Sequence, residues 1–192
     1  MRIIGISGKA GHGKDTVGNF LRAELEALGK SVLTTHYADL LKYICTNFFG
    51  WDGNKDEEGR SLLQWVGTEI RRAQHTDYFA NFICDVLSTF PNRWDYVIIP
   101  DVRFPNEIDV PISRGFDFIH LRVTRPNFNS GLTSEQQTHQ SEVALDTVVP
   151  DGVISNNADL ATLRAQVIAL ARLLESHDPL AEQCSLVAEC YT

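Results

Sequence analysis

The chain has 192 residues, of which 43% are hydrophobic and 22% charged. This length and composition fit one globular domain over residues 1–192 and exclude wholesale disorder, collagen and low-complexity sequence. The net charge of −8 argues against a protein that grips nucleic acid, because that affinity comes mostly from Lys and Arg, but it leaves small phosphorylated ligands open.

The first elements alternate between strand and helix. Residues 2–7 form a short apolar run, which is typical of a buried parallel strand. Residues 15–28 carry apolar side chains at helical spacing, and Gly29 stops this helix. Residues 31–37 are rich in β-branched side chains and predict the second strand, and residues 39–49 predict the next helix.

Helices dominate the middle of the chain. An acidic, exposed loop over residues 51–60 leads to a predicted helix over residues 61–74 with Ser61 as its cap. A second helix is predicted over residues 78–87, and residues 95–100 form a third apolar strand.

The last elements continue the alternation. We predict a short helix over residues 105–113, a strand over 116–123, a further strand over 152–155 and a closing helix over 158–174. The polar segment 124–141 is long enough to be a lid. Strands that alternate with helices predict an α/β fold, with about five parallel strands and helices on both faces.

Residues 8–16 (GKAGHGKDT) lie between the first strand and its helix and match G-x-x-x-x-G-K. In this position, glycines let backbone N–H groups curl round a phosphate, the helix N-terminus adds its positive dipole end, and Lys14 supplies an ammonium group. The alternative is a glycine-rich turn that only packs. The position between strand and helix favours phosphate binding.

Asp15 replaces the Ser or Thr that usually follows the lysine. A carboxylate beside phosphates is tolerable only with a metal or a positive neighbour, so Asp15 is a candidate Mg²⁺ ligand, directly or through water, or a proton acceptor. The structural alternative is a partner for the helix dipole. Thr16 supplies the next hydroxyl group, for the α-phosphate.

The third strand ends in Ile98-Ile99-Pro100-Asp101, which delivers a carboxylate to the edge of the sheet where ligands bind in open α/β folds. Asp101 is therefore our second acidic candidate, in the place of a Walker B acid. Arg103 would point to the same side and suits a substrate phosphate, with a surface salt bridge to Glu107 or Asp109 as its alternative. Pro100 is unusual in a central strand because it donates no ladder hydrogen bond.

Several other patterns fail. Residues 54–57 (NKDE) resemble a guanine-reading motif but end in Glu, and residues 52–56 begin like a calcium loop but lack its later ligands. His139 and Glu142 have metal-ligand spacing, but no second pair completes a zinc site, which favours a polar structural pair. Residues 11–16 lack the third glycine of a dinucleotide-binding fingerprint.

The four cysteines form no Cys-x-x-Cys pair, which fits a reducing cytoplasm. No run of 18 apolar residues and no signal-like segment is visible, so we expect neither export nor a membrane span.

Five motifs occur in order: the Gly-Lys-Asp-Thr loop, YADLLK (37–42), LLQWVGTE (62–69), IIPDVRFPNE (98–107) and HQSEVALD (139–146). With them the chain resembles the deoxynucleoside monophosphate kinases of phages, over roughly residues 3–162. Phosphomevalonate and dephospho-coenzyme A kinases share parts of this pattern. The resemblance implies a P-loop kinase fold and transfer of the ATP γ-phosphoryl group to a deoxynucleoside 5′-monophosphate (dNMP) with Mg²⁺.

The resemblance also implies roles for single residues. The residues expected to bind ATP are Gly11, His12, Gly13, Lys14, Asp15, Thr16 and Asn156, with Asn156 or Asn157 facing adenine. The expected metal ligands are Asp15 and Asp101, the latter through water. The catalytic set is Lys14, Asp15, Asp101, Arg103 and Arg125. Arg125 is a better candidate than Arg122 for the transferred phosphoryl group, because Arg122 is close to the preceding strand.

The acceptor pocket follows the second strand. Its expected residues are Asp39, Lys42, Gln64, Trp65, Thr68, Glu69, Arg71, Arg72, Arg103 and Glu142. Trp65 could stack on a base or belong to the core. The lid carries few cations after Arg125, which weakens the case for Arg125, and residues 175–192 form a weakly patterned tail. The sequence leaves open a homodimer, a non-nucleotide acceptor and a nucleotide-binding switch without kinase activity.

Overall fold

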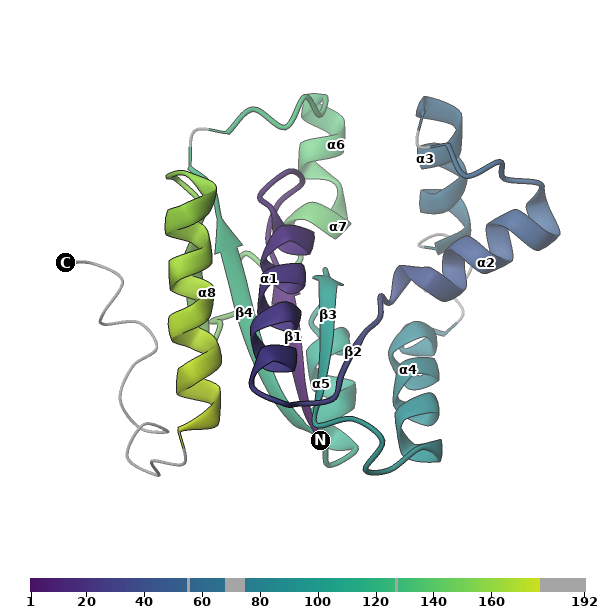
Figure 1. The fold of residues 1–192 in the computed structure, drawn as a ribbon. Helices are drawn as coiled ribbons and strands as arrows, with labels where there is room; N and C mark the ends of the chain where they lie inside the picture. The colour runs from purple at the N-terminus through teal and green to yellow at the C-terminus, as the bar shows by residue number, and fades with distance from the viewer. Residues whose placement is uncertain (55, 68–74, 127, 177–192) are drawn as a thin grey trace.

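The computed structural model describes residues 1–54, 56–67, 75–126 and 128–176 (Figure 1). Its helices and strands are β1 (Arg2–Ser7), α1 (Lys14–Ala27), β2 (Val32–Thr34), α2 (Ala38–Phe49), α3 (Glu57–Gln64), α4 (Tyr78–Thr89), β3 (Tyr96–Val102), α5 (Asn106–Ser113), β4 (Asp117–Thr124), α6 (Ser134–Thr138), α7 (Gln140–Val143), β5 (Gly152–Ser155) and α8 (Leu160–Glu175). The strands form one parallel sheet in the order β2-β3-β1-β4-β5, which confirms the predicted α/β fold.

The sheet is buried on both faces. Side chains alternate along β1, so Ile4 and Ile6 pack with α1 and α8 on one face, while Ile3 packs with α4 and α5 on the other. Figure 1 shows α1 and α8 running side by side across the near face. Burial on both faces explains why these strands appear as continuous apolar runs in the sequence.

The central position belongs to β1, which pairs with β3 on one side and β4 on the other. Because the strands are parallel, their carboxyl ends meet at one edge of the sheet. The glycine-rich loop follows β1, and Arg103 and Arg125 follow β3 and β4. The topology therefore gathers the predicted phosphate-binding residues at the edge where open α/β sheets bind ligands.

Pro100 lies at an irregularity between β1 and β3. Gly5 pairs with Ile99 but Ser7 pairs with Val102, so β3 has one extra residue at Pro100 and Asp101. A bulge tolerates a residue that has no N–H to donate. The proline ring packs on α1, where a Cβ at Gly18 would lie 3.3 Å from the Pro100 side chain. The unusual proline is therefore accommodated by a local bulge.

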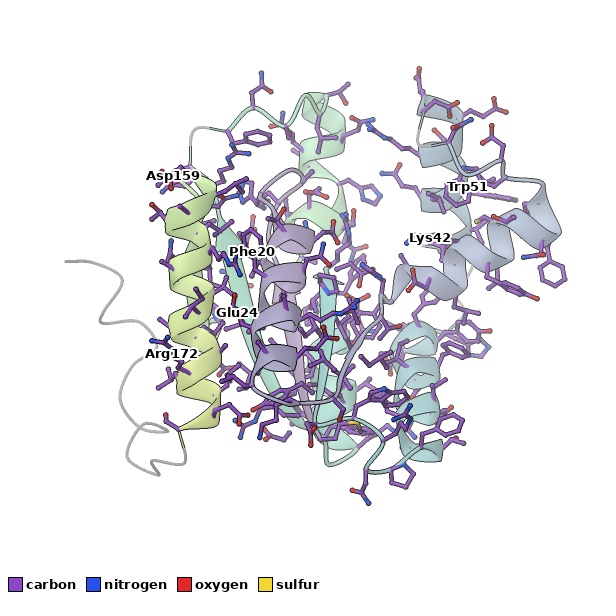
Figure 2. All side chains as sticks on the ribbon, in the orientation of Figure 1. Phe20, Glu24, Lys42, Trp51, Asp159 and Arg172 are labelled. Atoms are coloured by element: carbon purple, nitrogen blue, oxygen red, sulfur yellow. The ribbon has the colours of Figure 1, made fainter. Side chains whose placement is uncertain are left out.

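Helices α2 and α3 form a smaller unit beside the sheet (Figure 1). Their own core contains Cys45, Trp51 and Val66, and Figure 2 shows Trp51 within this unit. The aromatic side chains of Phe48 and Phe49 are exposed on it. This unit carries Asp39 and Lys42 of the predicted acceptor pocket.

Some predicted boundaries differ from the structure. Helix α3 begins at Glu57 because Asp56 caps it, accepting a hydrogen bond from Gly59 N at 2.8 Å. Ser61, the predicted cap, lies inside the helix and its hydroxyl group donates to Glu57 O. The second strand is shorter than predicted, and the lid segment contains helix α6. The described part of the chain has no helix long and apolar enough to cross a bilayer.

Candidate active site

The loop after β1 has the backbone of a phosphate-binding loop. Gly8, Gly11 and Gly13 adopt positive φ angles of 147°, 76° and 96°, and Gly13 is the N-cap of α1. Positive φ favours glycine, so the three glycines allow the chain to curl directly before the helix. The loop therefore lies at the positive end of the α1 dipole, as a phosphate site requires.

Two side chains from other parts of the chain contact this loop. Asn156, just after β5, donates a hydrogen bond from Nδ2 to His12 O at 2.9 Å, and a Cβ at Gly13 would lie 2.6 Å from this nitrogen. The ring of Phe128 leaves no room for a Cβ at Gly11. The Arg125 guanidinium lies 4.3 Å from the centre of the Phe128 ring, which brings Arg125 close to the loop.

Lys14 folds back over the loop. Its Nζ donates to Gly8 O at 2.7 Å and to Lys9 O at 3.1 Å. Burial, and then the charge of Arg103, lowers the pKa of Lys14 to about 8. The charges that act on Lys14 are those of Arg103, Glu142, Asp15 and Asp101, so the structure brings these predicted residues together.

The two predicted metal ligands have different surroundings. The Asp15 side chain, in the first turn of α1, is 78% exposed. The Asp101 carboxylate is partly buried and accepts hydrogen bonds from the backbone N–H groups of Tyr37 at 2.9 Å and Ala38 at 3.0 Å. Burial raises the pKa of Asp101 above its usual value. Asp101 therefore fixes the N-terminus of α2, a role that local sequence does not indicate.

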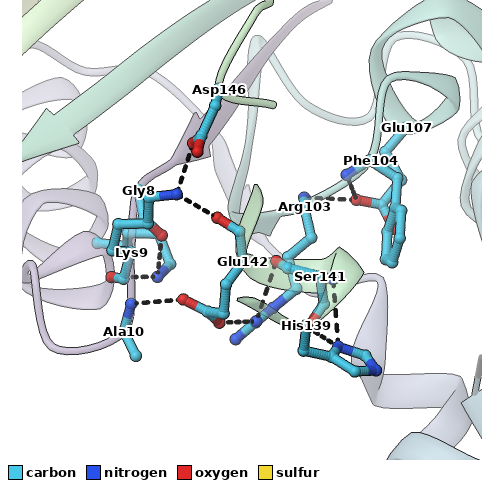
Figure 3. Close-up of polar contacts among 11 residues, drawn as sticks. Gly8, Lys9, Ala10, Arg103, Phe104, Glu107, His139, Ser141, Glu142 and Asp146 are labelled. Atoms are coloured by element: carbon cyan, nitrogen blue, oxygen red, sulfur yellow. Dashed lines mark hydrogen bonds and ion pairs between the residues drawn. The ribbon is translucent and has the colours of Figure 1, made fainter. Parts of the chain in front are cut away.

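Glu142 links three segments around the loop (Figure 3). One carboxylate oxygen pairs with Arg103 Nη1 at 2.5 Å, and the other accepts from Ala10 N at 3.0 Å. Lys9 Nζ donates to Glu142 O and to Asp146 Oδ1, both at 2.5 Å. Helix α7 is thereby fastened to the loop, and Arg103 pairs with Glu142 rather than with Glu107 or Asp109.

Glu107 supports Arg103 in another way. Its buried carboxylate accepts hydrogen bonds from the main-chain N–H groups of Arg103 at 2.7 Å and Phe104 at 3.1 Å. His139, the other half of the predicted polar pair, contacts Ser141 instead, with 2.9 Å between His139 Nδ1 and Ser141 Oγ (Figure 3). The chain after β3 is therefore held at both its backbone and its guanidinium group.

A cavity of about 200 Å³ opens between these groups, with Gly8, His12, Arg103 and Glu142 among its lining residues. Burial lowers the pKa of His12. A larger hollow of about 530 Å³ lies at the start of α4, near Asp77. The smaller cavity is the candidate site, because it joins the phosphate-binding loop to Arg103.

Among the predicted acceptor residues, Asp39 and Lys42 lie on α2, and Gln64 is the last residue of α3. Asp39 accepts a hydrogen bond from Lys42 Nζ at 2.9 Å. Burial raises the pKa of Asp39, but Lys42 and His36 together outweigh burial, so the pKa lies below its usual value. Gln64 and Trp65 are exposed, and Trp65 contacts Phe49 edge to face, with 5.9 Å between ring centres. Thr68, Glu69, Arg71 and Arg72 lie outside the described residues.

Arg122 lies inside β4, as its closeness to the strand suggested. Its Nη2 donates to Leu145 O and Val148 O, both at 2.7 Å. Through these two main-chain oxygens, the Arg122 guanidinium holds the segment after α7 against β4.

One contact was absent from the sequence predictions. His36, between β2 and α2, lies between Asp15 and Asp39, at 3.4 Å and 3.3 Å from their carboxylate oxygens. A lone histidine after a strand gives no local signal of such a position. Among the described residues, no group of three or more His, Cys, Asp and Glu side chains is arranged to hold a metal by itself.

Comparison with known proteins identifies the family. A model of the deoxynucleotide monophosphate kinase family matches residues 51–167. A putative deoxynucleotide monophosphate kinase of Acanthamoeba polyphaga mimivirus is 29% identical over 198 residues, covering 88% of this chain and 95% of that protein. The deoxynucleotide monophosphate kinase of Enterobacteria phage T4 is 31% identical over 110 residues, covering 56% of this chain and 43% of the phage protein.

Solved structures agree with the fold. The Mycobacterium tuberculosis APS kinase CysC in complex with AMPPNP and APS aligns with a TM-score of 0.52 at 12% identity, covering 91% of this chain and 98% of that one. At this identity the likeness supports the P-loop kinase fold alone. The family match, in contrast, extends from the α2–α3 unit to α8. The chain therefore belongs to the deoxynucleotide monophosphate kinase family of phosphotransferases.

Proposed function

We propose that the chain transfers the γ-phosphoryl group of ATP to the 5′-phosphate of a dNMP, giving the diphosphate and ADP. The observation that carries this proposal is one cavity that joins a glycine-rich loop at a helix N-terminus to the Arg103 guanidinium. Such a site holds two phosphate groups close together. Positioning and charge neutralisation supply most of the catalysis in phosphoryl transfer.

On the ATP side, backbone N–H groups of the loop and the Lys14 ammonium hold the phosphates. The proposed ATP-binding residues are Gly11, His12, Gly13, Lys14, Asp15, Thr16 and Asn156. Lys14 already lies over the loop, where its charge would meet the β- and γ-phosphates. Asn156 reaches the loop through its side-chain amide, which supports its place on this side of the site.

The donor groups present suit Mg²⁺, which binds proteins through one or two carboxylates together with substrate phosphates and water. The exposed Asp15 carboxylate is available as a direct ligand beside the loop. Both oxygens of Asp101 already accept N–H groups, which favours a contact through water. Bound Mg²⁺ would neutralise negative charge on the phosphates, while Asp101 itself holds the start of α2 in place.

On the acceptor side, Arg103 binds the dNMP phosphate and the α2–α3 unit binds the nucleoside. The remaining proposed residues are Asp39, Lys42, Gln64, Trp65, Thr68, Glu69, Arg71, Arg72 and Glu142. The exposed Trp65 ring offers a surface for a base. The buried Glu142 carboxylate orients Arg103 toward the cavity.

Arg125 is the proposed contact for the transferred phosphoryl group. Its stacking on Phe128 at the loop supports this role, and we propose that residues 124–141 act as the lid of a single domain. The free, buried Cys45 and Cys84 fit a setting in the reducing cytoplasm. The net charge of −8 fits small nucleotides as ligands better than nucleic acid.

An assay of ADP release with ATP and Mg²⁺ tests the proposal. The acceptors are the four dNMPs, the NMPs, phosphomevalonate and dephospho-coenzyme A, and Lys14→Ala is the inactive control. ADP release that depends on at least one dNMP is expected. Turnover only with a non-nucleotide acceptor would refute a dNMP as the substrate that accepts the phosphoryl group. ATP binding without any turnover would indicate a nucleotide-binding switch.

A further inference from the structure

The ring of His36 lies between two carboxylates that belong to different helices. Its Nε2 is 3.4 Å from Asp15 Oδ1, and its Nδ1 is 3.3 Å from Asp39 Oδ2. The His36 side chain is 29% exposed, against 78% for Asp15 and 49% for Asp39. The ring is thus the most enclosed of the three groups.

These carboxylates belong to the two halves of the proposed site. Asp15 is in the first turn of α1, directly after Lys14 of the phosphate-binding loop. Asp39 is in the first turn of α2, where it pairs with Lys42. A single side chain therefore contacts both the ATP side and the acceptor side, through opposite nitrogens of its ring, and it donates a hydrogen bond to both carboxylates when each nitrogen carries a proton.

The main chain holds His36 in this place. Its backbone N donates to Asp39 Oδ2 at 3.0 Å, and its backbone O accepts from Asp39 N at 3.1 Å. The backbone N–H groups of the next two residues, Tyr37 and Ala38, donate to the partly buried Asp101 carboxylate. These bonds fix the backbone at His36, and so the point from which its side chain extends.

We propose that His36 is a positioning residue that sets Asp15 through Nε2 and Asp39 through Nδ1, and so keeps the ATP side and the acceptor side in one arrangement. The inference rests on the proposed function for the meaning of the two sides. His36 acts on the substrates through the two carboxylates.

Two substitutions separate the halves of this inference. The amide of Asn reaches about as far along the side chain as Nδ1, so His36→Asn keeps a hydrogen-bonding group near Asp39 and loses the one near Asp15. The longer side chain in His36→Gln keeps a group near Asp15 and loses the one near Asp39. His36→Ala loses both.

The expected effects are opposite for the two variants. One hydrogen bond lost corresponds to about a fivefold change in affinity. His36→Asn should weaken a nonhydrolysable ATP analogue with Mg²⁺ about fivefold and leave the dNMP within about twofold of the wild type, and His36→Gln should do the reverse. Calorimetric titration of each ligand alone measures this without turnover, and the KM values for ATP and dNMP should change in parallel.

The control makes the same substitutions at His75, an exposed histidine before α4. His75→Asn and His75→Gln should leave both affinities unchanged. The inference is overturned if the two His36 variants change both affinities equally or change neither. A wild type that releases no ADP with any dNMP overturns the proposed function instead, and the ATP-analogue titrations then still decide the Asp15 half of the inference.

Discussion

The two sides of the proposed site are held by different means. The proposed ATP side follows the central strands. It is fixed by the positive φ angles of its glycines and by hydrogen bonds from Lys14 and Asn156 to main-chain carbonyl groups of the loop. The acceptor side grows from α2 and α3, whose own buried cluster contains Cys45, Trp51 and Val66. We expect the acceptor side to open more readily, because local stability follows the amount of buried apolar contact.

The largest expected effect is the loss of unfolding free energy when buried side chains are shortened in the core of the sheet and in the α2–α3 cluster. Ile98 in β3 is fully buried, so Ile98→Ala should lower the free energy of unfolding by about 2–5 kcal/mol. Val66→Ala, in the α2–α3 cluster, removes less from a smaller core and should cost about 1–2 kcal/mol. Chemical denaturation measures both. Equal costs would contradict the contrast between the two sides.

Removing the charge at the loop should act on turnover. Lys14→Ala should lower kcat at least about a hundredfold if, as we propose, Lys14 neutralises charge that develops on the transferred phosphoryl group. The free energy of unfolding of this variant should be close to that of the wild type. Burial disfavours the charged ammonium group, as the lowered pKa of Lys14 shows, so removing the group also removes an unfavourable contribution. Steady-state kinetics and thermal unfolding check the two parts. Near-normal turnover would refute the role of the loop.

Acid should weaken the ATP side first. His120 in β4 is 2% exposed, and its Nε2 lies 2.7 Å from Ser7 Oγ at the end of β1. Burial lowers the pKa of His120 to about 4, below the value of about 6.5 in the unfolded chain. The unfolded state therefore binds more protons between these values, so the stabilising contribution is complete above pH 6.5 and is lost as pH falls through this window.

At pH 5 the expected loss is up to about 2 kcal/mol of unfolding free energy. His120→Gln removes the titrating group and should flatten this part of the profile. Chemical denaturation of the wild type and of His120→Gln between pH 4 and pH 7 gives the difference in their unfolding free energies. The protonation of carboxylates affects both proteins equally and cancels in this difference. Parallel profiles would contradict the assignment.

The smallest expected effect separates the two substrates. Arg103→Ala should raise the KM for the dNMP about tenfold and the KM for ATP less, because a charged hydrogen bond to the acceptor phosphate is lost. Arg22→Ala, which breaks the exposed Arg22–Glu26 pair on α1, is the matched control and should change neither. Equal losses for both substrates would refute the division of the site.

The fold was predictable where its signals are local. An apolar run before glycines identifies β1 and the loop, and β-branched or apolar runs identify the other strands. The beginning of α3 was wrong, because Asp56 and Ser61 are both good N-cap residues and the sequence alone does not rank them. The α6 helix was missed because five residues carry too little periodicity.

The sequence suggested the residues of the candidate site, which stay predictions, but it did not reveal how these side chains pair. Arg103 was assigned two local partners, yet it pairs with Glu142, 39 positions away in the sequence. Asp101 was expected at the edge of the sheet, but its hydrogen bonds to the start of α2 depend on how β2 ends. The position of His36 depends on the same turn. Such contacts follow from tertiary packing, which a single sequence does not reveal.

The central position of β1 has a consequence for the order in which the protein is made. Residues 2–7 are synthesised before both of their strand partners, residues 96–102 and 117–124. β1 therefore has no strand neighbour until β3 has been synthesised, and it gains its second neighbour only with β4. Contacts so distant in sequence slow folding. The glycine-rich loop directly follows β1, so we expect it to take its final shape only after these later strands have paired.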